Sequence, residues 1–83
     1  MGDVEDLVPM VIEALKDNGG SAKIIEISKY IWDNYEDELR ISGDLFYRWQ
    51  YILRWTGTKL RNEGVLLSAS DSPNGLWVLS TSY

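Results

Sequence analysis

Residues 44–62 read DLFYRWQYILRWTGTKLRN, and the spacing of their apolar side chains decides the fold of this 83-residue chain. Apolar residues recur at intervals of three and four, which places them on one face of an α-helix. The face expected to enter the core carries Leu45, Trp49, Ile52, Thr56 and Leu60, with Phe46 and Leu53 beside it. We therefore predict one long helix over residues 44–62, ended by Asn62-Glu63-Gly64.

Positive charge is concentrated in the same part of the chain. Residues 40–61 hold five basic side chains against one acid, a net charge of +4, whereas residues 1–39 carry −7 and the whole chain −5. Basic side chains interleaved with aromatic ones on one helix are typical of a nucleic-acid-binding surface. The acidic remainder of the chain favours a protein partner instead, so the charge pattern leaves nucleic-acid binding and protein binding both open.

Two shorter helices are predicted before this long one. Residues 4–16 and 24–35 each carry an apolar stripe at helical spacing, and Asn18-Gly19-Gly20 ends the first of them. Residues 21–23 are expected to be a short extended piece. The segment 36–43 is predicted to be a polar connection whose two apolar residues point inward, Leu39 and Ile41.

The hydrophobic period changes after residue 64. Two short apolar runs, residues 65–69 and 76–80, enclose Asp71-Ser72-Pro73-Asn74-Gly75, and Asn-Gly is a strong signal for a β-hairpin. An isolated hairpin is unstable in water, so the hairpin should pack on the helices through Leu67, Trp77 and Leu79.

This order of elements predicts a single α+β, mostly α domain over residues 1–83, a winged helix-turn-helix with the hairpin as its wing. Gly57, in the middle of the long helix, costs about 1 kcal/mol against Ala and indicates a close approach of a neighbouring helix. We expect Trp32, Trp49 and Trp77 in the core. Trp55 is expected to close the groove between the long helix and the wing.

Composition argues against catalysis. The chain has no Cys and no His, which removes the commonest nucleophile–base pairs and metal ligands, so no catalytic residue, metal or cofactor is expected. It also has no apolar run of about 20 residues and no signal-peptide pattern. We therefore expect a cytoplasmic, non-enzymatic domain without membrane contact.

The third helix of a helix-turn-helix enters the major groove with its N-terminal half facing the bases. Arg side chains there can read guanine, Gln can read adenine and Tyr hydroxyls can reach phosphates. The predicted DNA contacts of this helix are Tyr47, Arg48, Gln50, Tyr51, Arg54, Thr58, Lys59 and Arg61. The wing tip offers Ser72 and Asn74 for polar contacts but no positive charge.

The chain resembles the N-terminal winged-helix domain of Mrr-type restriction endonucleases over nearly its whole length. The matching stretches are residues 8–15, Asn18-Gly19-Gly20, residues 24–31, residues 55–66 and Gly75-Leu76-Trp77-Val78-Leu79. The most specific is WTGTKLRNEGVL at 55–66. The resemblance implies a DNA-binding module of restriction–modification, which in that family precedes a nuclease domain. No nuclease domain follows here, so cleavage is not implied.

Three functions are compatible with these patterns. The first is binding of double-stranded DNA through residues 44–62. The second is a protein–protein interaction or homodimerisation through the Tyr, Trp and Arg face of the same helix, since aromatic and Arg residues are common interface anchors. The third is a DNA mimic that uses the acidic N-terminal half to occupy a basic groove.

Overall fold

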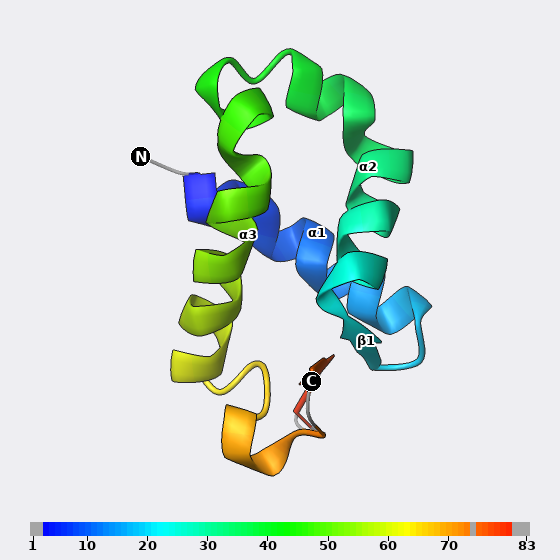
Figure 1. Cartoon of the computed structure of the whole chain (residues 1–83), viewed down its shortest axis with the longest axis vertical. Helices are drawn as coiled ribbons and strands as arrows, with labels where there is room; N and C mark the ends of the chain where they lie inside the picture. The colour runs from blue at the N-terminus through cyan, green and yellow to red at the C-terminus, as the bar shows by residue number, and fades with distance from the viewer. Residues whose placement is uncertain (1–2, 74, 81–83) are drawn as a thin grey trace.

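The computed structural model describes residues 3–73 and 75–80, and this part of the chain forms three α-helices and a small antiparallel sheet (Figure 1). In chain order the elements are α1 (Asp3–Asp17), β1 (Ser21–Lys23), α2 (Ile24–Arg40), α3 (Asp44–Asn62), a 3-10 turn (Ala69–Asp71) and β2 (Leu76–Val78). The predicted α+β, mostly α class is therefore confirmed.

Helix α3 has the predicted bounds, and its predicted core face is buried. Leu45, Trp49, Ile52, Thr56 and Leu60 are each at most 6% exposed. The hydroxyl of Thr56 donates a hydrogen bond to the carbonyl of Ile52 at 3.0 Å, so the one polar member of this face is satisfied. Gly64, at a φ of 79°, follows the helix in the left-handed conformation expected of a glycine cap.

Helix α2 continues beyond its predicted end at residue 35. The backbone of Tyr35 leaves the helical region (φ −129°, ψ 19°), and a further helical piece then runs to Arg40. The predicted polar connection is therefore wrong over residues 36–40. After this kink Leu39 is fully buried, as predicted, but Ile41 is 84% exposed, so the expectation that it points inward is wrong. The continued helix orients Leu39 toward the core and leaves Ile41 in the short turn outside it.

The core forms where α1 packs against both other helices. In Figure 1, α1 lies behind α2 and α3, which diverge on either side of it. The buried apolar residues come from all three helices, both strands and the segment after α3: Leu7, Val11, Ala14 and Leu15 of α1, Ala22 of β1, Ile27, Ile31 and Leu39 of α2, Leu45, Trp49, Ile52, Leu53 and Leu60 of α3, Leu66, and Trp77 of β2. Trp49 and Trp77 are thus core residues as predicted, whereas Trp32 is only partly buried.

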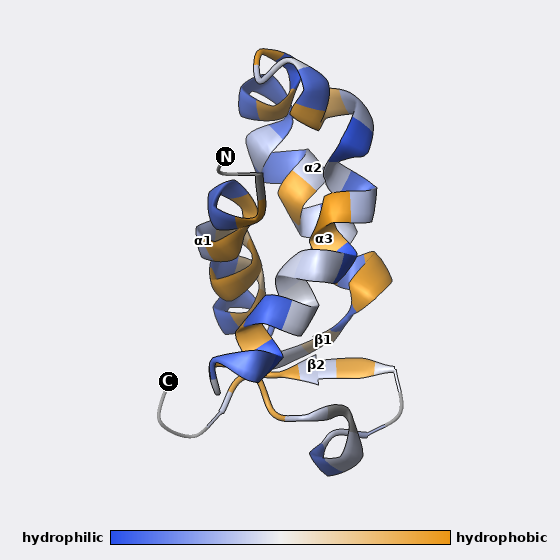
Figure 2. Cartoon of the chain, turned by 90° about the vertical axis from the view of Figure 1, so that its left-hand side faces the viewer, coloured by the Kyte–Doolittle hydropathy of each residue, from blue (hydrophilic) through white to orange (hydrophobic). Residues whose placement is uncertain are grey.

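The sheet differs from the predicted hairpin. Strand β2 pairs with β1, in an antiparallel register that places Ala22 opposite Trp77. The sequence predicts residues 65–69 as the main partner of β2. They contribute only a bridge between Leu66 and Leu79, with Leu67 N donating to Val78 O at 2.9 Å. Residues 69–71 form the 3-10 turn and therefore pair with no strand. Strand β1 pairs with the edge of β2 opposite the Leu66 bridge. Figure 2 shows β1 and β2 side by side at one end of the helices.

Trp77 of β2 lies against the backbone of α3 at Gly57. A Cβ atom at position 57 would stand 2.6 Å from Cη2 and 2.7 Å from Cζ2 of the indole. The close approach predicted from Gly57 is therefore present, but the neighbour is an indole from the sheet and not a helix. Leu79 also packs on the core, as predicted, and Leu67 is half-buried.

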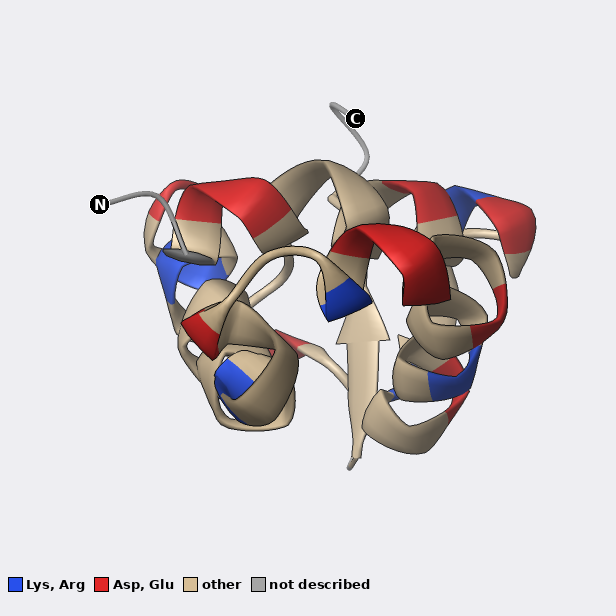
Figure 3. Ribbon diagram, turned by 90° about the horizontal axis from the view of Figure 1, so that it is seen from above, with Lys and Arg blue, Asp and Glu red and all other residues tan. Residues whose placement is uncertain are grey.

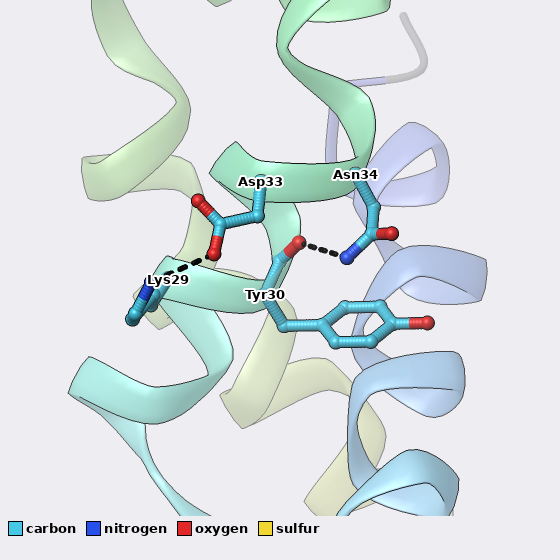
Figure 4. A network of polar contacts seen from close by, with 4 residues as sticks. All are labelled: Lys29, Tyr30, Asp33 and Asn34. Atoms are coloured by element: carbon cyan, nitrogen blue, oxygen red, sulfur yellow. Dashed lines mark hydrogen bonds and ion pairs between the residues drawn. The ribbon is translucent and has the colours of Figure 1, made fainter.

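A polar clasp joins α1 to α2. The hydroxyls of Tyr30 and Tyr35 both donate to the carboxylate of Glu13, Tyr30 at 2.8 Å. These bonds hold the pKa of Glu13 below its usual value, with Tyr35 the larger cause, and the same contact raises the pKa of Tyr30 to about 12. Figure 4 shows the Tyr30 ring reaching toward α1, while Lys29 pairs with Asp33 at 2.8 Å along α2.

Gly57→Ala is expected to destabilise the fold, although Ala is the better helix former. The added methyl would collide with the Trp77 indole, and overpacking of about 1–3 kcal/mol outweighs a propensity gain of about 1 kcal/mol. The free energy of unfolding in urea should fall by about 1–2 kcal/mol. Thr58→Ala, at the exposed next position, should change it by less than about 0.5 kcal/mol. A stabilising Gly57→Ala would contradict the contact.

The Tyr30→Phe/Tyr35→Phe variant is expected to lose stability at pH 7 relative to the natural chain, and to lose less as the pH falls. The folded-state pKa of Glu13 is lowered, so its contribution is present at neutral pH and disappears as the pH drops through that pKa. Thermal unfolding between pH 3 and 7 measures the difference. Tyr47→Phe, on the exposed face of α3, is the control and should follow the natural chain. A difference that stays constant with pH would refute the clasp.

Candidate nucleic-acid interface

Six of the eight predicted DNA contacts on α3 lie on one exposed face of the helix. At about 100° per residue they occupy an arc of roughly 160°, opposite the core face. Tyr47 is 84% and Tyr51 60% exposed, which makes them two of the most exposed large side chains of the described chain. The other exposed members of this face are Arg48, Gln50, Arg54 and Thr58.

The remaining two predicted contacts have side chains that are engaged within the fold, although Arg61 lies within the same arc by its position in the helix and Lys59 lies at its edge. Lys59 forms ion pairs with Glu63 at 2.7 Å and with Glu5 of α1 at 3.9 Å. The hydrogen bond to Glu63 is the main reason that the pKa of Lys59 is raised. Half-buried Arg61 turns toward the sheet, where Nη2 donates to the carbonyl of Leu76 at 3.5 Å. Both cations are therefore partly committed within the fold.

The predicted wing contacts are only partly described. The hydroxyl of Ser72 donates to the carbonyl of Ser68 at 2.8 Å, which closes the loop on itself. Ser68 in turn donates to the carboxylate of Asp71 at 3.1 Å. Asn74 lies outside the described residues. The side chains of Ser68, Asp71 and Ser72 thus stabilise the 3-10 turn and its immediate flanks.

The position predicted for Trp55 is wrong. Its side chain is 53% exposed and borders a hollow near the start of α1, together with Val4, Glu5 and Lys59, not a groove closed by the wing. Trp55 lies two residues before Gly57, and it is Trp77 that fills the space between α3 and the sheet. Trp55 meets Tyr51 edge to face instead, with ring centroids 6.5 Å apart.

A groove between α2 and α3 borders the exposed α3 face at Gln50, and the sequence did not predict it. It encloses about 370 Å³ and is lined by Ile25, Ser28, Lys29, Trp32, Phe46, Trp49 and Gln50. Trp32 stacks parallel to Trp49, with centroids 6.2 Å apart, and the Arg40 guanidinium lies 5.4 Å from the Trp32 ring. Ile25, out of phase with the buried α2 stripe and 69% exposed, is the residue that could have signalled this groove.

Acidic side chains are scarce on α3, where exposed Asp44 in the first turn is the one acid of residues 44–62. Residues 45–62 contain no Asp or Glu, whereas α1 and α2 carry most of the acids of the chain (Figure 3). Two of the α2 acids are already paired with cations of the same helix, Asp33 with Lys29 and Glu36 with Arg40. The charge of the folded chain is therefore divided between an acidic helical pair and a cationic face.

Comparisons with known proteins give no further guide. No protein-family model, curated protein or solved structure matches the chain. Among the described residues no helix is long and apolar enough to cross a membrane. The same residues contain no cluster of three or more potential metal ligands. The resemblance to the Mrr N-terminal domain stays a prediction.

Trp55→Phe is expected to remove the tryptophan emission that acrylamide quenches most. Trp55 is the most exposed of the four tryptophans, since Trp49 and Trp77 are buried and Trp32 is half-buried. The Stern–Volmer slope of the protein should therefore fall in Trp55→Phe. Trp49→Phe removes a buried emitter and should leave the slope unchanged or raise it. An unchanged slope in Trp55→Phe would place its indole in the core.

Proposed function

We propose that this chain is a winged helix-turn-helix domain that binds double-stranded DNA through α3 and catalyses no reaction by itself. The observation that carries the proposal is the exposed α3 face, on which Arg48, Gln50 and Arg54 lie together and Asp44 is the one acid of the helix. An α-helix of this kind fits the major groove of B-DNA, which is about 12 Å wide.

The winged-helix assignment is supported by the position of the sheet. Strand β2 lies between β1 and the bridge at Leu66, so residues 68–73 lie beyond one end of the helices as a wing would. This arrangement agrees with the resemblance to the Mrr N-terminal domain. Because the wing carries Asp71 and no cation, α3 would supply nearly all of the affinity.

On a duplex, Arg48 and Arg54 would neutralise phosphates or contact guanine, and Gln50 would contact adenine. The hydroxyls of Tyr47 and Tyr51 would reach the phosphates on either side. The acidic helices α1 and α2 would be repelled by the backbone, which orients the domain with α3 toward the DNA. With only two strong cations on the face, the affinity should be modest.

The alternative is docking of a protein partner or a second copy through the same face. It is favoured by one observation, the exposure of Tyr47, Tyr51 and Trp55, which are 84%, 60% and 53% exposed. Aromatic residues of this kind are common hot spots of interfaces. In that case a duplex would not bind, and the aromatic residues would matter more than the arginines.

Fluorescence anisotropy of a labelled random-sequence duplex, titrated at about 50 and 200 mM salt, tests DNA binding. Two neutralised phosphates give a log–log salt slope of about −1.8, so the affinity should drop about tenfold between these salts. The Arg48→Ala/Arg54→Ala variant should bind at least about tenfold more weakly at the lower salt.

Lys16→Glu is the matched control, because it changes the net charge by the same two units on an exposed position of α1. It should bind nearly as well as the natural chain if α3 makes the contacts. Equal losses in both variants would indicate a nonspecific charge effect, and no binding at about 50 mM salt would refute the proposal and leave the protein interface.

A further inference from the structure

Tyr47, Tyr51 and Trp55 form an aromatic ridge on the exposed face of α3. They are four residues apart, so each ring is attached about 6 Å further along the helix axis than the last. All three are more than half exposed. Single exposed aromatic residues are ordinary, but three at successive turns of one helix face indicate a binding surface.

The ring faces of this ridge are accessible. Trp55 meets Tyr51 at an interplanar angle of 70°, and Tyr47 meets its other neighbour, Phe46, at 76° with centroids 4.9 Å apart. In such edge-to-face contacts one ring covers only part of its neighbour, so the ridge still presents open π surfaces. A duplex cannot use these surfaces, because its base faces are covered by the neighbouring base pairs.

Two guanidinium groups flank the ridge. Arg48 and Arg54 lie three residues before and three residues after Tyr51, which places them about 60° to either side of it around the helix. Both are exposed. Flat ring faces between two cations match a ligand that is both aromatic and polyanionic, whereas an apolar protein partner would have to desolvate both charges.

We propose that the aromatic ridge stacks unpaired nucleobases, so that the domain binds single-stranded nucleic acid. Stacking on Tyr47, Tyr51 and Trp55 would hold successive bases, and Arg48 and Arg54 would contact the phosphates that join them. Such binding tolerates any sequence, because every base has a π face. This activity is separate from duplex binding and does not require it.

The experiment compares three labelled ligands by anisotropy at about 50 mM salt: an oligothymidylate of about 12 nucleotides, an abasic strand of equal length and a duplex. The natural chain should bind the oligothymidylate at least about tenfold more tightly than the abasic strand. Trp55→Ala and Tyr51→Ala should each weaken this binding about 5- to 100-fold. Trp55→Phe keeps an aromatic face and should stay within about threefold.

Intrinsic fluorescence gives a second readout. The oligothymidylate should quench tryptophan emission in the natural chain and not in Trp55→Phe, although that variant still binds. Trp55 is exposed, so Trp55→Ala should keep the far-ultraviolet circular dichroism and melting temperature of the natural chain. Equal affinity for the abasic strand, or unchanged affinity in both alanine variants, would overturn the proposal.

The duplex arm separates this proposal from the duplex-binding function. Binding of the duplex without the oligothymidylate refutes the aromatic ridge alone, and the reverse pattern refutes duplex binding alone. Sedimentation velocity supplies the remaining contrast. A dimer of the natural chain that dissociates in Trp55→Ala, together with no binding of the oligothymidylate, would assign the ridge to a second copy of the chain and overturn the proposal.

Discussion

The contact between the Trp77 indole and the bare backbone of Gly57 holds β2 against α3, and the placement of β1 and of the start of α2 depends on it. No other residue at position 57 leaves room for the six-membered part of the indole. With Trp77 seated there, β2 is held where β1 pairs with it, and β1 leads directly into α2. Because Gly57 has no side chain, Trp77 can pack there, and β2 is thereby held where β1 and the start of α2 meet it.

This packing also determines what α3 can do. Its core face packs against α1, α2 and Trp77, so the remaining arc, from Gln50 round to Arg48, faces outward. Lys59 pairs with Glu5 and Glu63, and half-buried Arg61 turns toward Leu76, whereas Arg48 and Arg54 are exposed on that arc. An acidic chain can therefore present one compact basic and aromatic surface, because most of its acids lie on α1 and α2.

The surface is better suited to base stacking than its cation content alone suggests. A reader of duplex DNA draws most of its affinity from phosphates, and two arginines supply little of that. Three exposed rings add a sequence-independent term that works only where bases are unpaired. The α2–α3 groove, with its parallel Trp32 and Trp49 rings, borders the same face through Gln50. The exposed α3 face is thus as much aromatic as it is cationic.

The bounds of α3, its buried residues and its exposed arc followed from the sequence, because helical periodicity is a local property of the backbone. Gly57 signalled a close contact by its position, but only the folded chain showed that Trp77 makes it. The pairing of Ser21 with Val78, the exposure of Trp55 and the neutralisation of Lys59 by Glu5 were decided by tertiary structure. Each depends on residues far apart in the chain. Local sequence patterns do not specify which distant residue pairs with a strand edge, covers a side chain or forms an ion pair.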